Sequence, residues 1–207
     1  MTERIPIILG SQSPQRAALL KSLVDDSEFV TLPPSDSQEL SFDELNTIAE
    51  IETRLQNIVY AKYQDVAQQL LAAGRDFNRC CVICADTIVV ATSLSEQPVV
   101  LGKPPETNWK DSVRQWFVAY YCDKVHEVWT NFLVVVGDQI IQQTVKTQLT
   151  LEALDDETID WYLETGEPIG KAGGYGIQGP AGALIPWISG SFTGIVGLPL
   201  AETANLL

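Results

Sequence analysis

The chain has 207 residues, of which 45% are hydrophobic and 19% are charged, and its formal net charge is −14. This composition is typical of a soluble globular protein and excludes a disordered one, and no apolar run is long enough to span a bilayer. The acidic balance argues against a protein that binds nucleic-acid polymers, because such proteins present a basic surface to the phosphates. A polyanionic substrate would therefore need a local cluster of lysines and arginines.

The length fits a single domain, 1–207, which is either compact or built as two small lobes around a cleft. The first apolar run, Ile5–Leu9, is too short for the hydrophobic part of a signal peptide and is typical of a strand. We therefore expect a cytoplasmic protein with no membrane partner.

A helix should follow this strand, because Ser13 and Pro14 have the pattern of an N-cap and a first helical position. The free amides of such a helix end can bind an anion, and Arg16 in the first turn favours that interpretation. An ordinary capped helix with a surface arginine has the same pattern. The sequence alone leaves both possibilities open.

The next part of the chain predicts a short strand at 29–32, a polar loop, and a mostly helical segment from Phe42 to about Ala73. The acids of the loop, Asp36 and Glu39 among them, are either solvated or ligands of a site. Lys62 lies beside the apolar stripe of the helix, where a lysine is usually solvated.

The segment Cys80–Ala91 predicts a buried strand through the middle of a sheet, and Asp86 is its single acid. Burying a carboxylate without a partner costs several kcal/mol, so cations or donors should meet Asp86 in either a structural pair or a functional site. Cys81 and Cys84 have the spacing of a zinc knuckle, but no second pair follows them. We expect these thiols to act as small core hydrophobes.

In the second half, Lys103 lies between a glycine and a proline, and this constrained loop suits the placing of a cation. The glycine-rich stretch 165–182 has neither the Gly-Lys-Ser/Thr order of a P-loop nor the spacing of a dinucleotide-binding turn. Its embedded Lys171 and Gln178 favour a defined loop over a flexible linker. The other expected elements are a strand at 99–101, a helix at 109–121, a hairpin of strands at 125–136 and 139–149, a helix at 150–163 and a short strand at 184–188.

Five segments taken together resemble the motif set of the Maf family. In chain order they are Leu9–Arg16, Ala85–Thr87, Leu101–Pro104, Lys171–Gly179 and Val196–Leu200. Each is weak alone, but five in this order span nearly the whole chain. The resemblance implies an α/β fold with a twisted mixed sheet, flanking helices and two lobes around a cleft, as in inosine triphosphatase-like proteins, and usually a homodimer.

The resemblance also implies a nucleoside triphosphate pyrophosphatase that needs a divalent metal cation, Mg²⁺ or Mn²⁺, and that removes unwanted nucleotides as monophosphate and pyrophosphate. Asp86 matches the proton acceptor and is also expected to contact the metal, with Glu39 as the second acid and Asp36 as its competitor. The residues that match phosphate-binding positions are Ser11, Arg16, Lys62, Lys103 and Lys171. Whether Asp86 is base, metal ligand or both stays open.

Three positions match those linked with base choice in that family, namely Gln15, Thr87 and Gln178. Thr87 and Gln178 resemble the subgroup that acts on dTTP and UTP, whereas Gln15 replaces that subgroup's usual arginine. The main alternative is a nucleotide-binding regulator of cell division without turnover, and a further one is a structural division protein. A serine or cysteine hydrolase is disfavoured, because the only histidine, His126, lies in a strand-like run.

Overall fold

The computed structural model describes residues 5–25, 28–35, 40–75 and 79–207, so Asp36 and Glu39 lie outside the described residues. The elements in chain order are β1 (Ile7–Gly10), α1 (Pro14–Leu20), β2 (Phe29–Thr31), α2 (Ile48–Ala72), β3 (Cys81–Thr92), β4 (Pro98–Leu101), α3 (Trp109–Trp116), the π-helix η2 (Phe117–Tyr121), β5 (Val125–Val136), β6 (Gln139–Thr150), α4 (Asp156–Glu164), the 3₁₀ turns η3 (Ala172–Gly174) and η4 (Pro180–Leu184), β7 (Trp187–Ser189), α5 (Phe192–Val196) and α6 (Leu200–Ala204).

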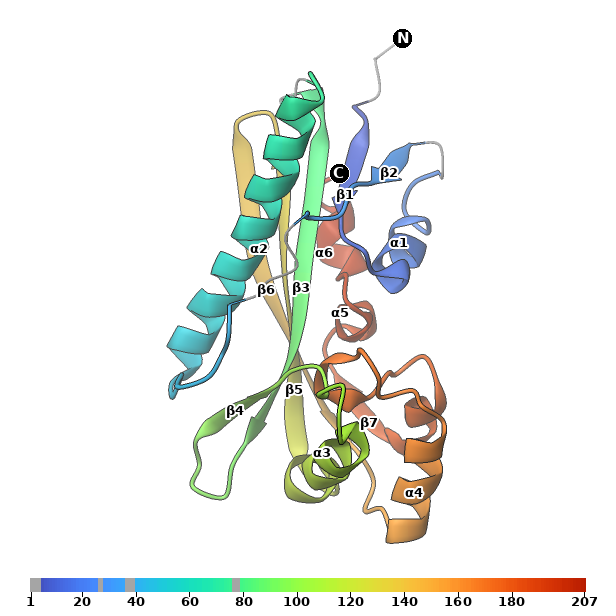
Figure 1. The fold of residues 1–207 in the computed structure, drawn as a ribbon. Coiled ribbons are helices and arrows are strands. Elements are labelled where there is room, and N and C mark those ends of the chain that lie inside the picture. The colour runs from blue at the N-terminus through green and yellow to red at the C-terminus, as the bar shows by residue number, and fades with distance from the viewer. Residues whose placement is uncertain (1–4, 26–27, 36–39, 76–78) are drawn as a thin grey trace.

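The seven strands of the described residues form one mixed sheet in the order β2-β1-β3-β5-β6-β7, with β4 paired to β3 (Figure 1). β1 runs parallel to both of its neighbours, and the other pairs are antiparallel. The α/β class with a mixed sheet and flanking helices is therefore the predicted one.

β3 organises the sheet because its two edges are used differently. One edge pairs with β5 along 81–90. On the other edge, β1 pairs with 81–84 and β4 pairs with 89–92. The stretch 85–88 has no strand partner on that edge among the described strands, so the sheet opens there between an upper lobe with β1 and a lower lobe with β4 (Figure 1). Asp86 lies in this gap.

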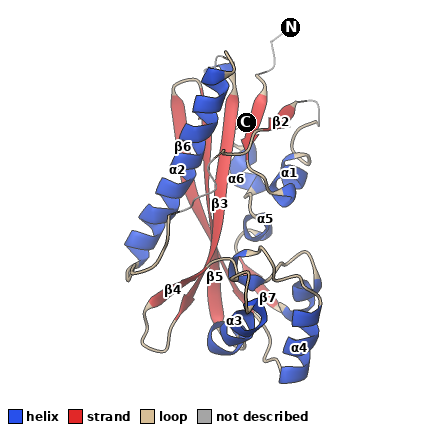
Figure 2. Ribbon diagram, viewed as in Figure 1, coloured by secondary structure: helices blue, strands red, loops and turns tan. Residues whose placement is uncertain are grey.

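Helices cover both faces of the sheet (Figure 2). Alternate residues of β3 enter different cores, as the period-two geometry of a strand requires. Ile83 and Ala85 pack in the core that also holds Leu20 of α1 and Leu198, whereas Val82 packs with α2 on the opposite face. A third core fills the lower lobe between β3, α3, η2 and α4.

Cys81 and Cys84 follow the same alternation and lie in the two cores on opposite faces of the sheet. They therefore cannot bind one metal ion together. Burial raises the pKa of Cys81 to about 11 and that of Cys84 to about 12, which keeps both thiols protonated. Both act as small core residues, as expected.

α2 begins at Ile48 and not at Phe42 as the apolar pattern predicted. The cause is a capping box, in which the Thr47 side chain accepts from the Glu50 amide while the Glu50 carboxylate accepts from the Thr47 amide. This pair ends the preceding turn and fixes the first residue of the helix. Within the described ranges, no helix has both the length and the apolar character to cross a membrane.

The C-terminal elements also differ in their bounds from the sequence pattern. α4 begins at Asp156, not near Thr150, because Thr150 still pairs in β6 and Asp155 caps the helix by accepting from the Thr158 amide. The predicted strand at 184–188 is η4 followed by β7. The helix predicted at 109–121 is α3 continued by the π-helical η2.

Candidate active site

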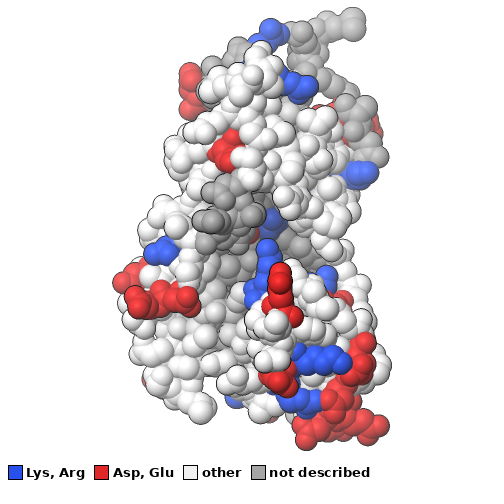
Figure 3. Space-filling view, viewed as in Figure 1, with Lys and Arg blue, Asp and Glu red and all other residues white. Residues whose placement is uncertain are grey.

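The gap along β3 opens into a cavity of about 700 Å³ that is lined by both lobes. All the described residues that the resemblance singled out line it together: Ser11, Gln15, Arg16, Lys62, Asp86, Thr87, Lys103, Lys171 and Gln178. Glu39 lies outside the described residues, so the second acid stays a prediction. Figure 3 shows lysine and arginine side chains at the waist between the lobes, beside an acidic side chain, while the other acidic side chains lie in separate patches on the lobe surfaces.

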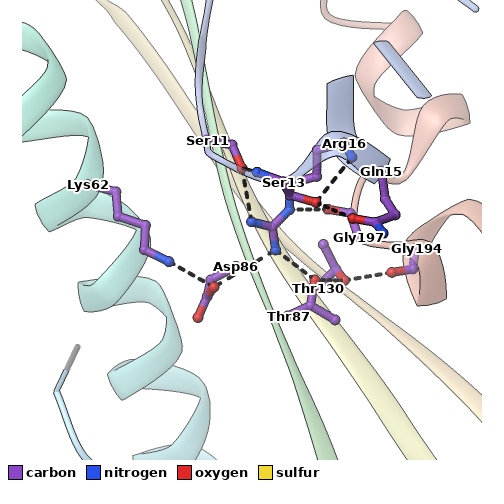
Figure 4. Close-up of polar contacts among 10 residues, drawn as sticks. All are labelled: Ser11, Ser13, Gln15, Arg16, Lys62, Asp86, Thr87, Thr130, Gly194 and Gly197. Atoms are coloured by element: carbon purple, nitrogen blue, oxygen red, sulfur yellow. Dashed lines mark hydrogen bonds and ion pairs between the residues drawn. The ribbon is translucent and has the colours of Figure 1, made fainter. Parts of the chain in front are cut away.

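Asp86 is 8% exposed and is met by two cations. Its Oδ1 accepts from Nζ of Lys62 at 2.8 Å and lies 3.8 Å from Nη2 of Arg16. Lys62 reaches it from α2 and Arg16 comes from the other side (Figure 4). These partners offset the cost of burying the carboxylate. Oδ2 accepts no hydrogen bond from a described residue, so half of the carboxylate remains open to a ligand.

Arg16 is oriented by several directed contacts (Figure 4). Its Nε donates to the carbonyl of Gly197 at 2.9 Å and its Nη1 to Ser11 Oγ at 3.3 Å. Its Nη2 donates to Thr87 Oγ1 at 3.1 Å. The planar guanidinium is thereby fixed between β3 and the segment after α5. This explains the motif Val196–Leu200, which carries no ionisable group but supplies the carbonyl that holds Arg16.

Gly197 has φ of 126°, and a Cβ there would lie 3.2 Å from Nε of Arg16. Gly197→Ala should cost about 1–3 kcal/mol of stability through backbone strain and should lower kcat/KM, because the methyl group displaces the guanidinium. Thermal melting and steady-state kinetics measure the two effects. Gly166→Ala is the matched control, because Gly166 also has positive φ (69°) but a Cβ there meets nothing within 4 Å. Equal kinetic effects of the two substitutions would contradict this role of Gly197.

Lys103 and Lys171 line the cavity from the lower lobe. Neither ammonium group makes a hydrogen bond or ion pair with any residue that the structure describes. Their segments are joined by a hydrogen bond from the Gly173 amide to the Gly102 carbonyl at 2.9 Å. Two cations that form no ion pair with a described residue therefore face the same cavity and are available to an anionic ligand.

The glycine-rich loop is compact because neighbouring side chains occupy the space of the missing Cβ atoms. A Cβ on Gly176 would lie 2.8 Å from Cε of Lys171, and one on Gly179 would lie 1.7 Å from Oε1 of Glu167. Glu167 Oε2 also accepts from the Ala181 amide at 3.1 Å. The glycines thus let Glu167 and Lys171 pack under the loop, and the loop is a defined structure, as expected.

Buried aromatic hydroxyl groups hold the start of this loop. Tyr121 donates to the Gly173 carbonyl at 2.9 Å and Tyr162 to the Gly174 carbonyl at 3.2 Å. His126 Nε2 lies 2.8 Å from the Tyr175 hydroxyl. His126 is 2% exposed and lies against these rings, so it supports the loop from below.

Burial lowers the pKa of His126 from 6.5 to about 4. Between these values the unfolded chain binds more protons at this site than the folded chain, so stability should fall as the pH drops from about 6.5 to about 4. Between pH 7 and pH 5 the loss should be on the order of 2 kcal/mol. Denaturant unfolding at both pH values should show this loss, and His126→Gln should reduce it. An unchanged pH dependence in the variant would contradict the assignment to His126.

The proposed base-choice residues lie on two sides of the cavity. Gln15 belongs to α1 and its Oε1 accepts from the Ser13 hydroxyl at 3.1 Å, while Gln178 belongs to the glycine-rich loop. Thr87 lies on β3 between them in the chain. Their convergence on one cavity fits a bound base, but their role remains a prediction.

Sequence reasoning missed the residues that position the site from beneath. Thr130 and His126 point to the same face of β5, with Val128 between them, and all three contact elements of the cavity wall. A pattern that could have revealed the polar ones is the recurrence of polar residues with period two in an apolar strand. No sequence signal distinguishes Glu167, because an acid beside a glycine-rich stretch is usually solvated.

The chain is thus an α/β protein whose cleft gathers cations from separate segments around one open carboxylate. It belongs to the Maf family, since the family model described as "Maf-like protein" matches residues 6–207.

Curated relatives match along most of their length. A protein of Ruegeria sp. (strain TM1040) named dTTP/UTP pyrophosphatase is 39% identical over 97% of this chain and 92% of its own. Relatives with the same name in Cereibacter sphaeroides and Pyrococcus furiosus are 41% and 33% identical, each over 97% of this chain and 93% of their own.

Proposed function

We propose that this chain cleaves the bond between the α and β phosphorus of a nucleoside triphosphate, preferring dTTP and UTP, and releases the monophosphate and pyrophosphate. The observation that carries the proposal is the gathering of Arg16, Lys62, Lys103 and Lys171 around Asp86 in a chain of net charge −14. Such a local reversal of charge suits a polyphosphate. The names of the relatives support the same reaction.

In this proposal both lobes contribute residues that bind the phosphates. Lys103 and Lys171 bind phosphate oxygens from the lower lobe, and Arg16 binds them from the upper lobe. Asp86 accepts the proton of the attacking water, and Lys62 orients its carboxylate through Oδ1. These groups come from α1, α2, β3, the segment after β4 and the glycine-rich loop, so a nucleotide bound between the two lobes would be oriented by both of them.

The donor set fits a divalent cation that is shared with the substrate. Mg²⁺ is usually held by one or two carboxylates together with phosphate oxygens, and the described part of the cavity offers Asp86 with an open Oδ2, whereas Glu167 is engaged by the loop. In the part of the chain that the structure describes, no cluster of three or more acidic, histidine or cysteine side chains could hold a metal alone. A bound Mg²⁺ or Mn²⁺ would neutralise phosphate charge.

The proposal further includes a homodimer, as the family resemblance implies, and a cytoplasmic location. Analytical ultracentrifugation of the purified chain tests the dimer.

The reaction is tested by incubating the purified chain with dTTP, UTP, CTP and GTP, with Mg²⁺, with Mn²⁺ or with EDTA, and by measuring both products. We expect equimolar monophosphate and pyrophosphate from dTTP and UTP, and none with EDTA. Release of orthophosphate would contradict cleavage between α and β. Tight nucleotide binding without any product would favour the non-catalytic regulator.

A further inference from the structure

Thr130 on β5 connects two walls of the site without touching the cavity itself. It is fully buried and lies directly opposite Thr87 in the β3–β5 register. Its Oγ1 donates to the Gly194 carbonyl of α5 at 2.7 Å and lies 2.8 Å from Thr87 Oγ1 (Figure 4).

The direction of each bond follows from the number of hydrogens. A threonine hydroxyl has one hydrogen, and that of Thr130 is given to Gly194. In the contact between the two threonines Thr130 must therefore accept, so Thr87 donates. Thr87 then accepts from Arg16 Nη2. These hydrogen bonds therefore all run in one direction, from Arg16 through both hydroxyl groups to α5.

Together with the bond from Arg16 to Gly197, this series of hydrogen bonds forms a closed ring that includes Arg16. The guanidinium contacts the α5 segment twice, through Nε to the Gly197 carbonyl and through Thr87 and Thr130 to the Gly194 carbonyl. Both anchors depend on the seating of α5 against the sheet, and Thr130 contributes a hydrogen bond to that seating from β5. Loss of its hydroxyl would leave the Thr87 hydrogen without its acceptor and loosen both anchors together.

We propose that Thr130 is a positioning residue, which sets the orientation of Arg16 toward the phosphates by holding Thr87 and α5. This inference rests on the proposed function for the role of Arg16. Thr130 acts only through other residues and touches no ligand.

The test compares Thr130→Val, which keeps the shape and removes the hydroxyl, with Thr130→Ser, which restores it. Thr203→Val is the matched control, because Thr203 is equally buried and donates to the Pro199 carbonyl at 2.7 Å, and neither residue lines the cavity. We expect Thr130→Val to lower kcat/KM for dTTP about tenfold, Thr130→Ser to stay within about twofold of wild type, and Thr203→Val to change melting but not kcat/KM.

A second arm separates positioning from general loosening of the fold. In an Arg16→Lys background, where the guanidinium fork is gone, Thr130→Val should add at most about a twofold loss. Fully additive effects, or wild-type kcat/KM in folded Thr130→Val, would overturn the inference. If circular dichroism shows Thr130→Val to be unfolded, Thr87→Val breaks the same ring from the cavity side and should show the tenfold loss; wild-type kinetics there would overturn it.

The proposed reaction can be contradicted independently of the inference about Thr130. A wild-type chain that releases no pyrophosphate contradicts the reaction, and the inference is then judged by calorimetric binding of inorganic tripolyphosphate. Thr130→Val should bind tripolyphosphate more weakly than both wild type and Thr203→Val. Equal affinities would overturn the positioning role.

Discussion

Asp86→Asn is expected to lower kcat for dTTP hydrolysis by about 10²- to 10⁴-fold, the usual contribution of a general base, while nucleotide binding is retained. Asparagine keeps the size of aspartate, and its amide oxygen can still accept from Lys62, 2.8 Å away in the native side chain. It cannot accept a proton from water. Removal of one negative charge also leaves the cavity more attractive to a polyphosphate, so dTTP affinity measured by calorimetry should be equal or higher.

The control for this variant is Asp156→Asn, which removes a carboxylate that is 91% exposed on α4. Its kcat and KM should match those of the wild type. An Asp86→Asn enzyme with undiminished turnover would remove Asp86 from the mechanism. If Asp86→Asn lost both dTTP binding and turnover, Asp86 would instead be required for binding the nucleotide.

Lys171→Met should reduce kcat/KM by about 30- to 150-fold, corresponding to about 2–3 kcal/mol for a charge-assisted hydrogen bond to phosphate. The melting temperature should hardly change. The ammonium group has no partner among the described residues, and methionine keeps an unbranched stem against Gly176. Activity and stability are therefore separable at this position, and steady-state kinetics with thermal melting measures both.

Lys124→Met is the matched control, because Lys124 lies outside the cavity and donates to the carbonyls of Ala119 and Val118. It should leave kcat/KM unchanged. A Lys171→Met chain that keeps wild-type kcat/KM would show that the lower lobe does not bind the phosphates. A large loss of stability would show that Lys171 supports the loop in the absence of ligand.

The sequence predicted the chemistry-bearing residues better than the bounds of the elements. Asp86 was recognisable because an acid in an apolar strand requires partners, and the structure supplies Lys62 and Arg16. The predicted start of α2 was too early, because the apolar stripe continues on the N-terminal side of Thr47, the residue that caps the helix. Helix ends depend on local hydrogen bonds that hydrophobic periodicity does not contain.

By itself the sequence determined the apolar strand with its single acid and the glycine-rich loop with its lysine, because these follow from local composition and spacing, whereas the α/β class followed from the resemblance to the Maf family. The tertiary structure decided which edge of β3 stays open, since that depends on where β1 stops and β4 starts. It also decided the ring from Arg16 to α5, whose members are far apart in the chain. Contacts between distant segments arise only when the sheet assembles, so no local pattern could have revealed them.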